Sequence, residues 1–541
     1  MIKIYTLLIT LFTASGIYAQ TSTLLKDINP GTGYADFKNP KIIGNKMYFA
    51  ADDGTHGLEP WVSDGTPEGT YMLKDINPGS AGSDPKEFTL YNNNIYFAAT
   101  EPTLGRELWM TNNTQSGTQL FMDIYPGAGS GNPLQFKDGL GLLFFQANNG
   151  VNGAEAWKTN GTINGTSMII DFTPGNIDGF PINFKEYNGR MYFQANTEVA
   201  GIEPCYTDGT PEGTGILKDI APGATEVGGM GSPTIYNGLL YFVGNTQGIG
   251  YELWVTDGTE EGTERILDLG NGDISGLAPT SGMYVYNEEL YFAGAVETEY
   301  DWQLWKSDGT EQGTAQVSNF TGVDGETPPY MGDAFVFNNL LYFRKAVSLG
   351  AGVILWSSDG TEDGTIKAVT PIPALFNRVN FCSVLGNSIY YLDYIPSTID
   401  LVIWKSDGTA AGAEMIPLPE NSFPAPFNLS SAWMGLLGGK IIYYAMHDMS
   451  KGFELYILDA GTVVSLSENK NDKNIKLYPN PANDRVQIVL PQFGNVTIYN
   501  AMGTLIESVT MNTNHTLDVR HYAPGIYIAK VQDEVVRFIK E

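Results

Sequence analysis

The chain has 541 residues, 42% hydrophobic and 12% aromatic, so it is long enough for more than one domain and too apolar for a disordered acidic chain. Its 60 acidic and 30 basic residues give a net charge of −30, which argues against binding to nucleic acid or to an anionic membrane surface. Two Cys and four His exclude a disulfide scaffold and repeated zinc sites, and 63 Gly with 29 Pro indicate many turns.

The N-terminus has the composition of a secretory signal peptide. Lys3 gives a basic start, Ile4 to Phe12 form an apolar stretch, and Ala19 is a small residue before an expected cut ahead of Gln20. We assign residues 1–19 to a signal peptide in preference to a buried N-terminal strand. No Cys follows the cut and no later run of 18 apolar residues occurs, so neither a lipid anchor nor a transmembrane segment is expected.

A repeat of 48 to 52 residues organises the chain from about residue 36 to 467. The tryptophan of LEPWVSDGTPEGT serves as its marker, and an aromatic pair such as Tyr48-Phe49 precedes the marker by 12 or 13 residues in most units. The marker position recurs nine times, at Trp61, Trp109, Trp157, Cys205, Trp254, Trp305, Trp356, Trp404 and Tyr456.

Each unit contains four short strand signals. In the second unit they are EFTLYN, NIYFAAT, ELWMTN and TQLFMDI, which are rich in β-branched and aromatic residues. Pairs such as Asn188-Gly189 predict a two-residue hairpin between the first two strands, and DGTPEGT predicts a tight turn between the last two. Four antiparallel strands repeated in this way indicate an all-β protein, with one large β-propeller of four-stranded blades over residues 20–467.

The marker tryptophan is expected to fill the space between neighbouring blades, because both faces of a blade are covered. Cys205 occupies this slot in the fourth unit, so we interpret it as a small buried hydrophobe rather than a nucleophile. Cys382 lies in the first strand of a unit four steps away, so a bridge between the two is not expected.

The number of blades depends on how the ring closes. Leu24–Gly31 repeats the sequence around Met72–Gly79, so the chain opens with a fourth strand that has no unit of its own. Such a strand would complete the last blade, but Thr462–Leu466 offers that unit another fourth strand. The sequence therefore predicts eight or nine blades and leaves the two counts open.

These repeats resemble the ELW-x-x-DGT-x-x-GT repeat family of secreted bacterial proteins. The match is close at Glu252–Thr263 and Leu58–Thr70, and it departs where Ile354 and Val402 replace the usual Glu and where Asn112-Asn113 replaces Asp-Gly. The resemblance covers roughly four fifths of the chain. It implies a propeller-like extracellular module and brings no established reaction with it.

A polar linker at residues 468–475 separates the repeats from a different C-terminal segment, 476–541. Its alternating apolar residues predict a small antiparallel, Ig-like β-sandwich. The segment resembles the type A C-terminal sorting domain of the type IX secretion system of Bacteroidetes-type bacteria. The residues that match are Tyr478, Pro479, Asn480, Pro481, Ala482, Tyr499, Gly503, Gly525 and Tyr527, with Leu517-Asp518-Val519 between them. The resemblance implies handling by the type IX machinery, then release or attachment at the cell surface.

Function is expected on the propeller face that carries the second-to-third and fourth-to-first connections, whose loops vary most. Acidic residues gather there in the sequence, at Asp52, Asp53, Glu101, Glu198, Glu297 to Asp301, Asp75, Asp123, Asp171, Asp219 and Asp268. Such a rim could bind Ca²⁺ or polar glycans, but the same residues could simply cap turns and solvate the surface. Calcium loops of the D-x-D-x-D-G type are absent from the sequence.

Six glutamates occupy the position two residues before the marker: Glu59, Glu107, Glu155, Glu203, Glu252 and Glu454. They recur too regularly for a catalytic pair, and no unit carries a large insertion. His56 and His447 are expected in loops, and His515 and His521 lie in the sorting segment. No catalytic or cofactor-binding residue is therefore predicted.

The leading hypothesis is an exported non-enzymatic propeller for binding or adhesion to a glycan or surface protein. The alternative is a secreted polysaccharide-active hydrolase or lyase that uses carboxylates on the variable face.

Overall fold

The computed structural model divides into two compact units, Met1–Val463 and Val464–Glu541, which are described separately. It describes residues 21–540 except for 224, 271, 273, 297–300, 321–327, 349–351, 369–376, 379–381, 396–399, 410–411, 417–432, 446–449, 460–475, 479–483, 490–493, 501–504, 512–513, 523–524 and 532–533. The regions assigned to the signal peptide and the linker lie outside these residues. Within them, no helix has the length and apolarity needed to cross a lipid bilayer.

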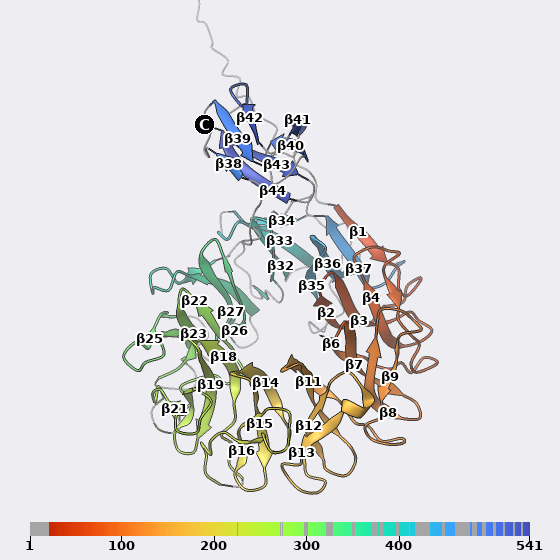
Figure 1. Cartoon of the computed structure of the whole chain (residues 1–541), viewed down its shortest axis with the longest axis vertical. Helices are drawn as coiled ribbons and strands as arrows, with labels where there is room; N and C mark the ends of the chain where they lie inside the picture. Colours follow the sequence, from red (N-terminus) through yellow and green to blue (C-terminus); the bar gives the residue numbers. More distant parts are fainter. Residues whose placement is uncertain are drawn as a thin grey trace, which may run out of the picture. The chain divides into compact units, whose positions relative to one another are not determined.

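The described part of the N-terminal unit contains nine antiparallel sheets, which we number as blades 1 to 9 (Figure 1). Blade 1 consists of β2 (Lys38–Ile43), β3 (Lys46–Asp52), β4 (Leu58–Ser63) and β5 (Tyr71–Met72), and blade 2 of β6 (Lys86–Tyr91), β7 (Asn94–Glu101), β8 (Gly105–Thr111) and β9 (Gln119–Met122). Blade 3 consists of β10 (Leu134–Gly139), β11 (Leu142–Asn148), β12 (Ala154–Thr159) and β13 (Ser167–Ile170), and blade 4 of β14 (Ile182–Tyr187), β15 (Arg190–Thr197), β16 (Gly201–Thr207) and β17 (Gly215–Ile216). Blade 5 consists of β18 (Gly231–Tyr236), β19 (Leu239–Thr246), β20 (Gly250–Thr256) and β21 (Glu264–Arg265). A 3-10 turn, η1 (Ile163–Gly165), lies between β12 and β13.

Blades 6 to 9 repeat the pattern with two changes. Blade 6 consists of β22 (Met283–Tyr286), β23 (Glu289–Gly294), β24 (Gln303–Ser307) and β25 (Ala315–Gln316), and blade 7 of β26 (Tyr330–Phe337), β27 (Leu340–Ser348), β28 (Gly352–Ser358) and β29 (Ile366–Lys367). Blade 8 consists of β31 (Cys382–Leu385), β32 (Ser388–Ile395), β33 (Asp400–Ser406) and β34 (Glu414–Ile416), and blade 9 of β35 (Met434–Leu437), β36 (Lys440–Ala445), β37 (Glu454–Asp459) and β1 (Thr21–Lys26). In blade 7 an extra strand, β30 (Asn377–Arg378), pairs parallel with β28. In blade 9 the fourth strand comes from the N-terminus.

The hydrophobic cores lie between blades. Phe97 and Trp109 of blade 2, for example, pack with Tyr48, Val62 and Leu73 of blade 1. Each marker residue joins such a cluster, and the cross-strand ring pairs, such as Phe49 on Trp61 with centroids 6.4 Å apart, widen its apolar surface. The expectation that the marker fills the space between blades is confirmed, including at the fully buried Cys205.

The sequence of contacts between blades closes on itself. The first strands β2, β6, β10, β14, β18, β22 and β26 each contact the next, β31 contacts β35, and β35 contacts β2. Blades 7 and 8 share a core that includes Tyr342 and Trp404, and blades 9 and 1 share one that includes Leu437 and Trp61. Figure 1 shows the nine sheets following one another around a common centre. The N-terminal unit is thus a nine-bladed β-propeller in the described residues.

Closure depends on β1. This strand pairs antiparallel with β37, placing Leu24 opposite Tyr456 and Ser22 opposite Leu458. The N-terminal strand therefore completes the last blade, which is one of the two arrangements that the sequence left open. Thr462–Leu466, the alternative fourth strand, lies outside the described residues.

The C-terminal unit is also all-β. One sheet has the order β38 (Lys476–Tyr478), β39 (Arg485–Val489) and β42 (Asn514–Asp518); the other has β41 (Leu505–Met511), β40 (Gly494–Asn500), β43 (Gly525–Val531) and β44 (Glu534–Lys540). Residues of both sheets form one core, among them Val486 and Leu517 from the first and Val496 and Tyr527 from the second. The all-β prediction is confirmed, and the Ig-like topology stays a prediction.

Removal of β1 tests the closure. A mature chain that lacks residues 20–26 loses the fourth strand of blade 9, so we expect its melting temperature to fall by about 5 °C or more. Differential scanning calorimetry measures this shift. Lys26→Ala, which keeps the strand, is the control and is expected to melt within about 1 °C of the parent. Equal melting of the truncated and complete chains would show that closure does not need β1.

Candidate functional site: the loop collar

Two kinds of connection meet on one face of the propeller. We call the fourth-to-first connections straps and the second-to-third connections tips, and their assembly the loop collar. The straps are residues 27–37, 73–85, 123–133, 171–181, 217–230 and 266–282, and the tips are 53–57, 102–104, 149–153, 198–200 and 247–249. This is the face on which the sequence predicts function.

Each strap is hydrogen-bonded to the blade before it and to the blade after it. In the strap 171–181, the Phe180 N–H donates to the Ala154 carbonyl of blade 3 at 3.1 Å, and the Gly179 carbonyl accepts from the Asn196 N–H of blade 4 at 2.6 Å. At the closing joint the Ala35 N–H donates to Phe453 of blade 9, and the Ala35 carbonyl accepts from Asp52 of blade 1. The straps therefore join neighbouring blades through their backbones.

A buried glutamate anchors the middle of each strap in six blades. The carboxylate of Glu252 accepts N–H groups from Leu269 at 2.9 Å, Gly270 at 3.2 Å and Gly276 at 2.9 Å. Equivalent bonds are made by Glu59, Glu107, Glu155, Glu203 and Glu454, and all six side chains are fully buried. In blade 6 the amide oxygen of Gln303 accepts from Phe320 at 2.9 Å instead. Ile354 and Val402 offer no acceptor in blades 7 and 8.

Burial has a strong electrostatic effect on these glutamates. It raises the pKa of Glu59, Glu107, Glu203 and Glu252 to about 7 and of Glu155 and Glu454 to about 8, although the N–H donors act in the opposite direction. A pKa near neutrality is a property of general acids, but these groups are enclosed and bonded to the backbone. Their geometry is that of a structural anchor, as their regular recurrence suggests.

Three of the aspartates near the start of the straps lie against the second-to-third connections. Asp171 Oδ2 accepts from Asn152 Nδ2 at 2.7 Å, and Asp75 Oδ2 lies 4.0 Å from His56 Nε2. At the closing joint, Asp27 Oδ2 accepts from Lys451 Nζ at 2.6 Å. In the described residues, the other oxygen, Oδ1, is buried without a hydrogen-bond partner in Asp27, Asp75, Asp123 and Asp171. Asp219 and Asp268 are exposed.

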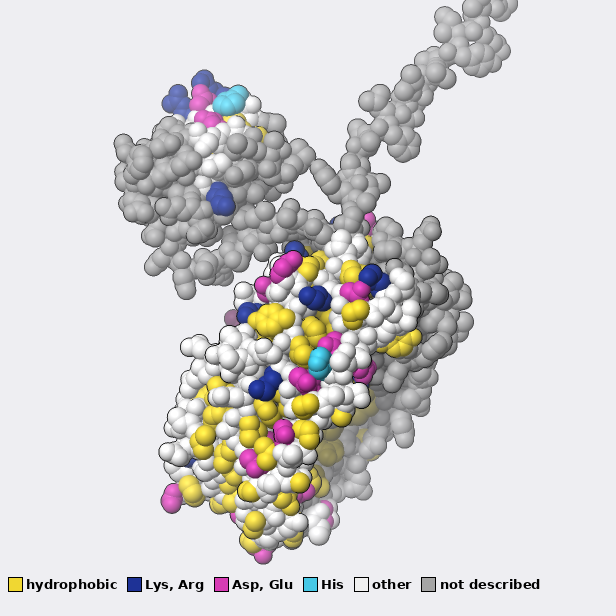
Figure 2. All heavy atoms as spheres, turned by 90° about the vertical axis from the view of Figure 1, so that its right-hand side faces the viewer, with side chains coloured by type: hydrophobic (Ala, Val, Ile, Leu, Met, Phe, Trp, Pro, Cys, Tyr) yellow, Lys and Arg dark blue, Asp and Glu magenta, His cyan; other side chains and the backbone are white. Residues whose placement is uncertain are grey.

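The acidic residues of the tips shape their own loops. Asp53 Oδ1 accepts from the N–H groups of Thr55 and His56 at 2.9 Å, and Glu101 Oε2 accepts from Thr103 and Leu104 in the same way. On the side of the molecule drawn in Figure 2, acidic side chains are interspersed with apolar and basic ones. No group of three potential metal ligands occurs in the described part of the chain. Binding of Ca²⁺ stays a prediction, and residues 297–300 of the acidic rim lie outside the described residues.

The DGT turns, found in blades 1 and 4 to 8, are closed corners away from the collar. Asp257 Oδ1 accepts from the N–H and hydroxyl of Thr259 at 2.8 and 2.7 Å, and the Gly262 N–H donates to the same hydroxyl at 2.9 Å. The hydrogen bond from the Thr259 hydroxyl lowers the pKa of the Asp257 carboxyl. These aspartates are thus used to fold the turn.

Both cysteines are free thiols. Burial raises the pKa of the Cys205 thiol well above its usual range and that of Cys382 to about 12. A thiol with a raised pKa is a poor nucleophile at neutral pH. This agrees with the interpretation of Cys205 as a buried hydrophobe.

The structure places only some of the sorting-signal residues. Tyr478 ends β38, Tyr499 lies in β40, and Gly525 begins β43. Tyr527 is buried, with its ring 4.7 Å from that of Tyr522. Pro479, Asn480, Pro481, Ala482 and Gly503 lie outside the described residues.

Sequence reasoning missed one feature of the straps, a residue with left-handed backbone just before the first strand of blades 1 to 4. Asp36, Asp84 and Asn132 occupy this position with φ of 42°, 46° and 45°, and Asp and Asn tolerate it. Phe180 takes the same position with φ 46°. An alignment of the straps could have found this exception, because a bulky residue stands where the others are short and polar.

The fold and its collar define a β-propeller. The C-terminal unit is of another kind: residues 476–541 match the family model of the secretion system C-terminal sorting domain. The chain thus carries a type IX secretion sorting domain, which directs it to the cell surface or the extracellular space. No curated protein matches the sequence.

Several solved structures resemble the chain at low identity. They include a prolyl endopeptidase (TM-score 0.39, 9% identity, 68% of this chain and 55% of that one) and oligopeptidase B from Leishmania major (0.40, 9%, 68% and 54%). Another is the β-propeller domain of the trilobed protease from Pyrococcus furiosus (0.33, 11%, 71% and 98%). The chain spans little more than half the length of the two peptidases.

Substitution of Glu252 tests the anchor. Glu252→Ala leaves three buried N–H groups without an acceptor, so we expect the free energy of unfolding to fall by about 3 kcal/mol. Glu252→Gln keeps an acceptor, as Gln303 does in blade 6, and is expected to cost less. Denaturant titration measures both. Glu261→Ala, an exposed glutamate of the same blade, is the matched control, and an equal loss there would contradict the anchor.

The same anchors predict how stability depends on pH. The folded pKa of Glu252, about 7, lies above its ordinary value of 4.5, so the folded chain binds more protons than the unfolded one between these values. The stability contributed by this group is present below pH 4.5 and is lost as pH rises through 7. We expect the parent to melt at a lower temperature at pH 8 than at pH 5, and Glu252→Gln to lose less over that interval. An identical loss in both would exclude titration of Glu252.

Proposed function

We propose that the protein is a non-enzymatic binding or adhesion module, exported through type IX secretion and acting at the cell surface or outside the cell. The observation that carries the proposal is the use of the repeated carboxylates. The anchoring glutamates are enclosed, the DGT aspartates close turns, and Asp53 and Glu101 bond to their own loops. Much of the acidity of the repeats therefore serves folding, and the exposed collar is left for contact with a ligand.

The alternative, a polysaccharide-active hydrolase or lyase, needs two accessible carboxylates that flank a substrate. The glutamates with the raised pKa values expected of a general acid, such as Glu155 and Glu252, are fully buried. The near-identical length of the repeats also leaves little room for a lid or a catalytic insertion. Both points support binding without turnover.

A paired assay distinguishes the two functions. The purified mature chain is applied to a glycan array and to a panel of immobilised surface proteins, and the same polysaccharides are screened for release of reducing sugar and of unsaturated products. We expect retention on at least one ligand and no release of product. Turnover that is abolished by one carboxylate substitution on the collar would overturn the proposal in favour of the enzyme.

A further inference from the structure

The straps and tips of blades 3 and 4 break the symmetry of the collar. Val151 and Val199, at the centres of the tips of blades 3 and 4, occupy the position that Thr55 and Thr103 hold in blades 1 and 2. In the strap between blades 3 and 4, Ile177 stands where the three preceding straps have Gly33, Ala81 and Gly129. Phe180 replaces the short polar residue at the left-handed position. Large apolar side chains thus replace small or polar ones at four neighbouring places.

These side chains are exposed and their loops are in contact. We group them with Val227 of the next strap as the apolar patch; their exposed fractions are 67% for Val151, 59% for Ile177, 52% for Phe180, 75% for Val199 and 37% for Val227. A Cβ atom added to Gly153 would lie 2.3 Å from the Ile177 carbonyl oxygen, so the tip of blade 3 lies against the strap. On the other side of the strap, the Glu198 N–H donates to the Phe172 carbonyl at 3.1 Å.

The backbone of Phe180 adds an independent sign of use. A bulky residue with φ of 46° has a strained backbone. Because the Phe180 side chain is exposed, this strain is not accompanied by packing in a core. The equivalent Asp84 and Asn132 hold the same conformation at lower cost. An exposed aromatic ring kept in this position fits contact with another molecule better than it fits folding.

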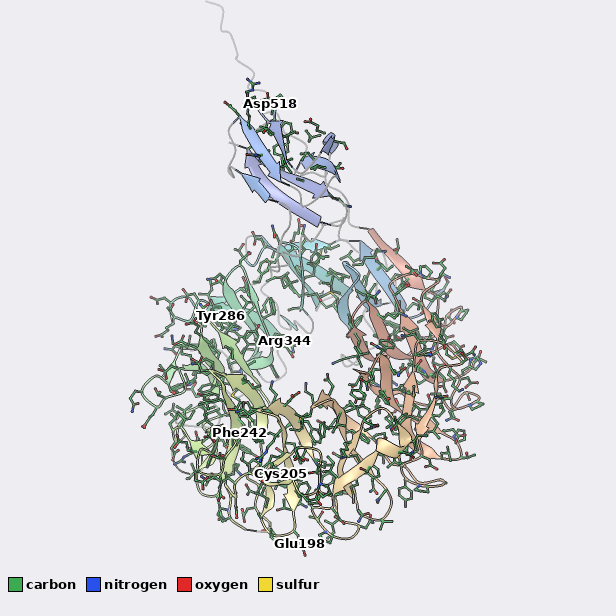
Figure 3. The ribbon with its side chains drawn as sticks, viewed as in Figure 1. Glu198, Cys205, Phe242, Tyr286, Arg344 and Asp518 are labelled. Carbon is green, nitrogen blue, oxygen red and sulfur yellow. The ribbon has the colours of Figure 1, made fainter. Side chains whose placement is uncertain are left out.

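The charge around the patch indicates what that molecule is. The straps and tips of blades 3 and 4 carry one basic residue, Lys218, whose Nζ donates to the Thr263 carbonyl of blade 5 at 2.6 Å. They carry five acidic residues: Asp171, Asp178, Glu198, Asp219 and Glu226. Glu198, labelled in Figure 3, lies at the rim of the ribbon. A second copy of a chain with a charge of −30 would be repelled by this surface, whereas a cationic partner would be attracted.

The shape of the patch favours a polypeptide over a sugar. Four of its five residues are branched aliphatic side chains, which lack the flat ring face on which sugars stack. We propose, on the basis of the binding function above, that the collar of blades 3 and 4 binds a protein segment whose apolar side chains alternate with Lys or Arg. The apolar residues cover Val151, Ile177 and Val199, the cations face the surrounding carboxylates, and one of them lies over the ring of Phe180.

Peptide binding to the complete mature chain tests the proposal. The probe is a fluorescent 14-residue peptide of alternating Leu and Lys, compared with a Leu/Glu and a Ser/Lys peptide by anisotropy at physiological salt. We expect the Leu/Lys peptide to bind at least about tenfold more tightly than either comparator. Equal binding of the Ser/Lys peptide would show that charge alone accounts for the interaction and would overturn the proposal. Failure of the Leu/Lys peptide to bind would also overturn it.

Variants that copy the other blades locate the site. Phe180→Asn with Val199→Thr installs the residues of Asn132 and Thr103, and we expect it to weaken binding of the Leu/Lys peptide about tenfold or more. Val199→Thr alone, at a highly exposed tip, should weaken binding without any change in melting temperature. The matched control, Ile366→Thr with Met415→Thr, removes exposed apolar side chains from the fourth strands of blades 7 and 8 and should bind as the parent does. Equal effects in variant and control would contradict the site.

The outcome also separates this inference from the proposed function. If the double variant loses the peptide but keeps a ligand found on the glycan array, the patch and a second binding surface both exist. If the double variant still binds the peptide, the assignment of the binding site to the apolar patch is wrong, whatever the array shows. If the parent binds an array ligand but not the peptide, the binding function stands and the inference fails.

Discussion

The hydrogen bonds between a buried glutamate and the backbone of the strap are the interaction on which the rest of the propeller depends. A strap crosses from the outer strand of one blade to the inner strand of the next, so its N–H groups pass through a region without a neighbouring strand to accept them. Glu252 and its equivalents satisfy these donors from the third strand. With the strap fixed in this way, its other carbonyl and N–H groups form hydrogen bonds with the blades on either side.

The closing joint uses the same chemistry as the joints within the chain. Glu454 accepts from the N–H groups of Ile28 and Asn29, at 2.9 Å each, although more than 400 residues separate them. The N-terminal strand therefore brings with it the strap that the last blade needs. Because this contact is so distant in sequence, its loop-closure entropy is larger than that of a joint between consecutive blades.

Much of the fold could be predicted from the sequence, because repetition reveals which positions matter. The marker tryptophan, the aromatic pair and the Asn-Gly hairpins predicted four-stranded blades and their filler, and the copied LLKDINPG made β1 one of two candidates for the last edge. The count stayed open between eight and nine because two segments competed for one edge, and pairing at an edge cannot be read from composition. The structural role of the glutamates could not be read from the sequence. Their recurrence argued against catalysis, but the partners of five of them lie 17 to 24 residues further along the chain, across a strap of variable sequence, and those of Glu454 lie near the N-terminus.

The outer edges of the blades have a consequence for a chain that must leave the cell. The fourth strands β5, β17, β21, β25 and β29 are two residues long, and β5, β17 and β21 lead directly into straps. A long open edge would present a row of unpaired N–H and C=O groups to any unfolded or misfolded chain nearby. Edges this short offer too few groups for a foreign strand to pair with. These five blades can therefore expose a sheet edge without offering a template for aggregation during export, whereas β9, β13 and β1 leave longer edges.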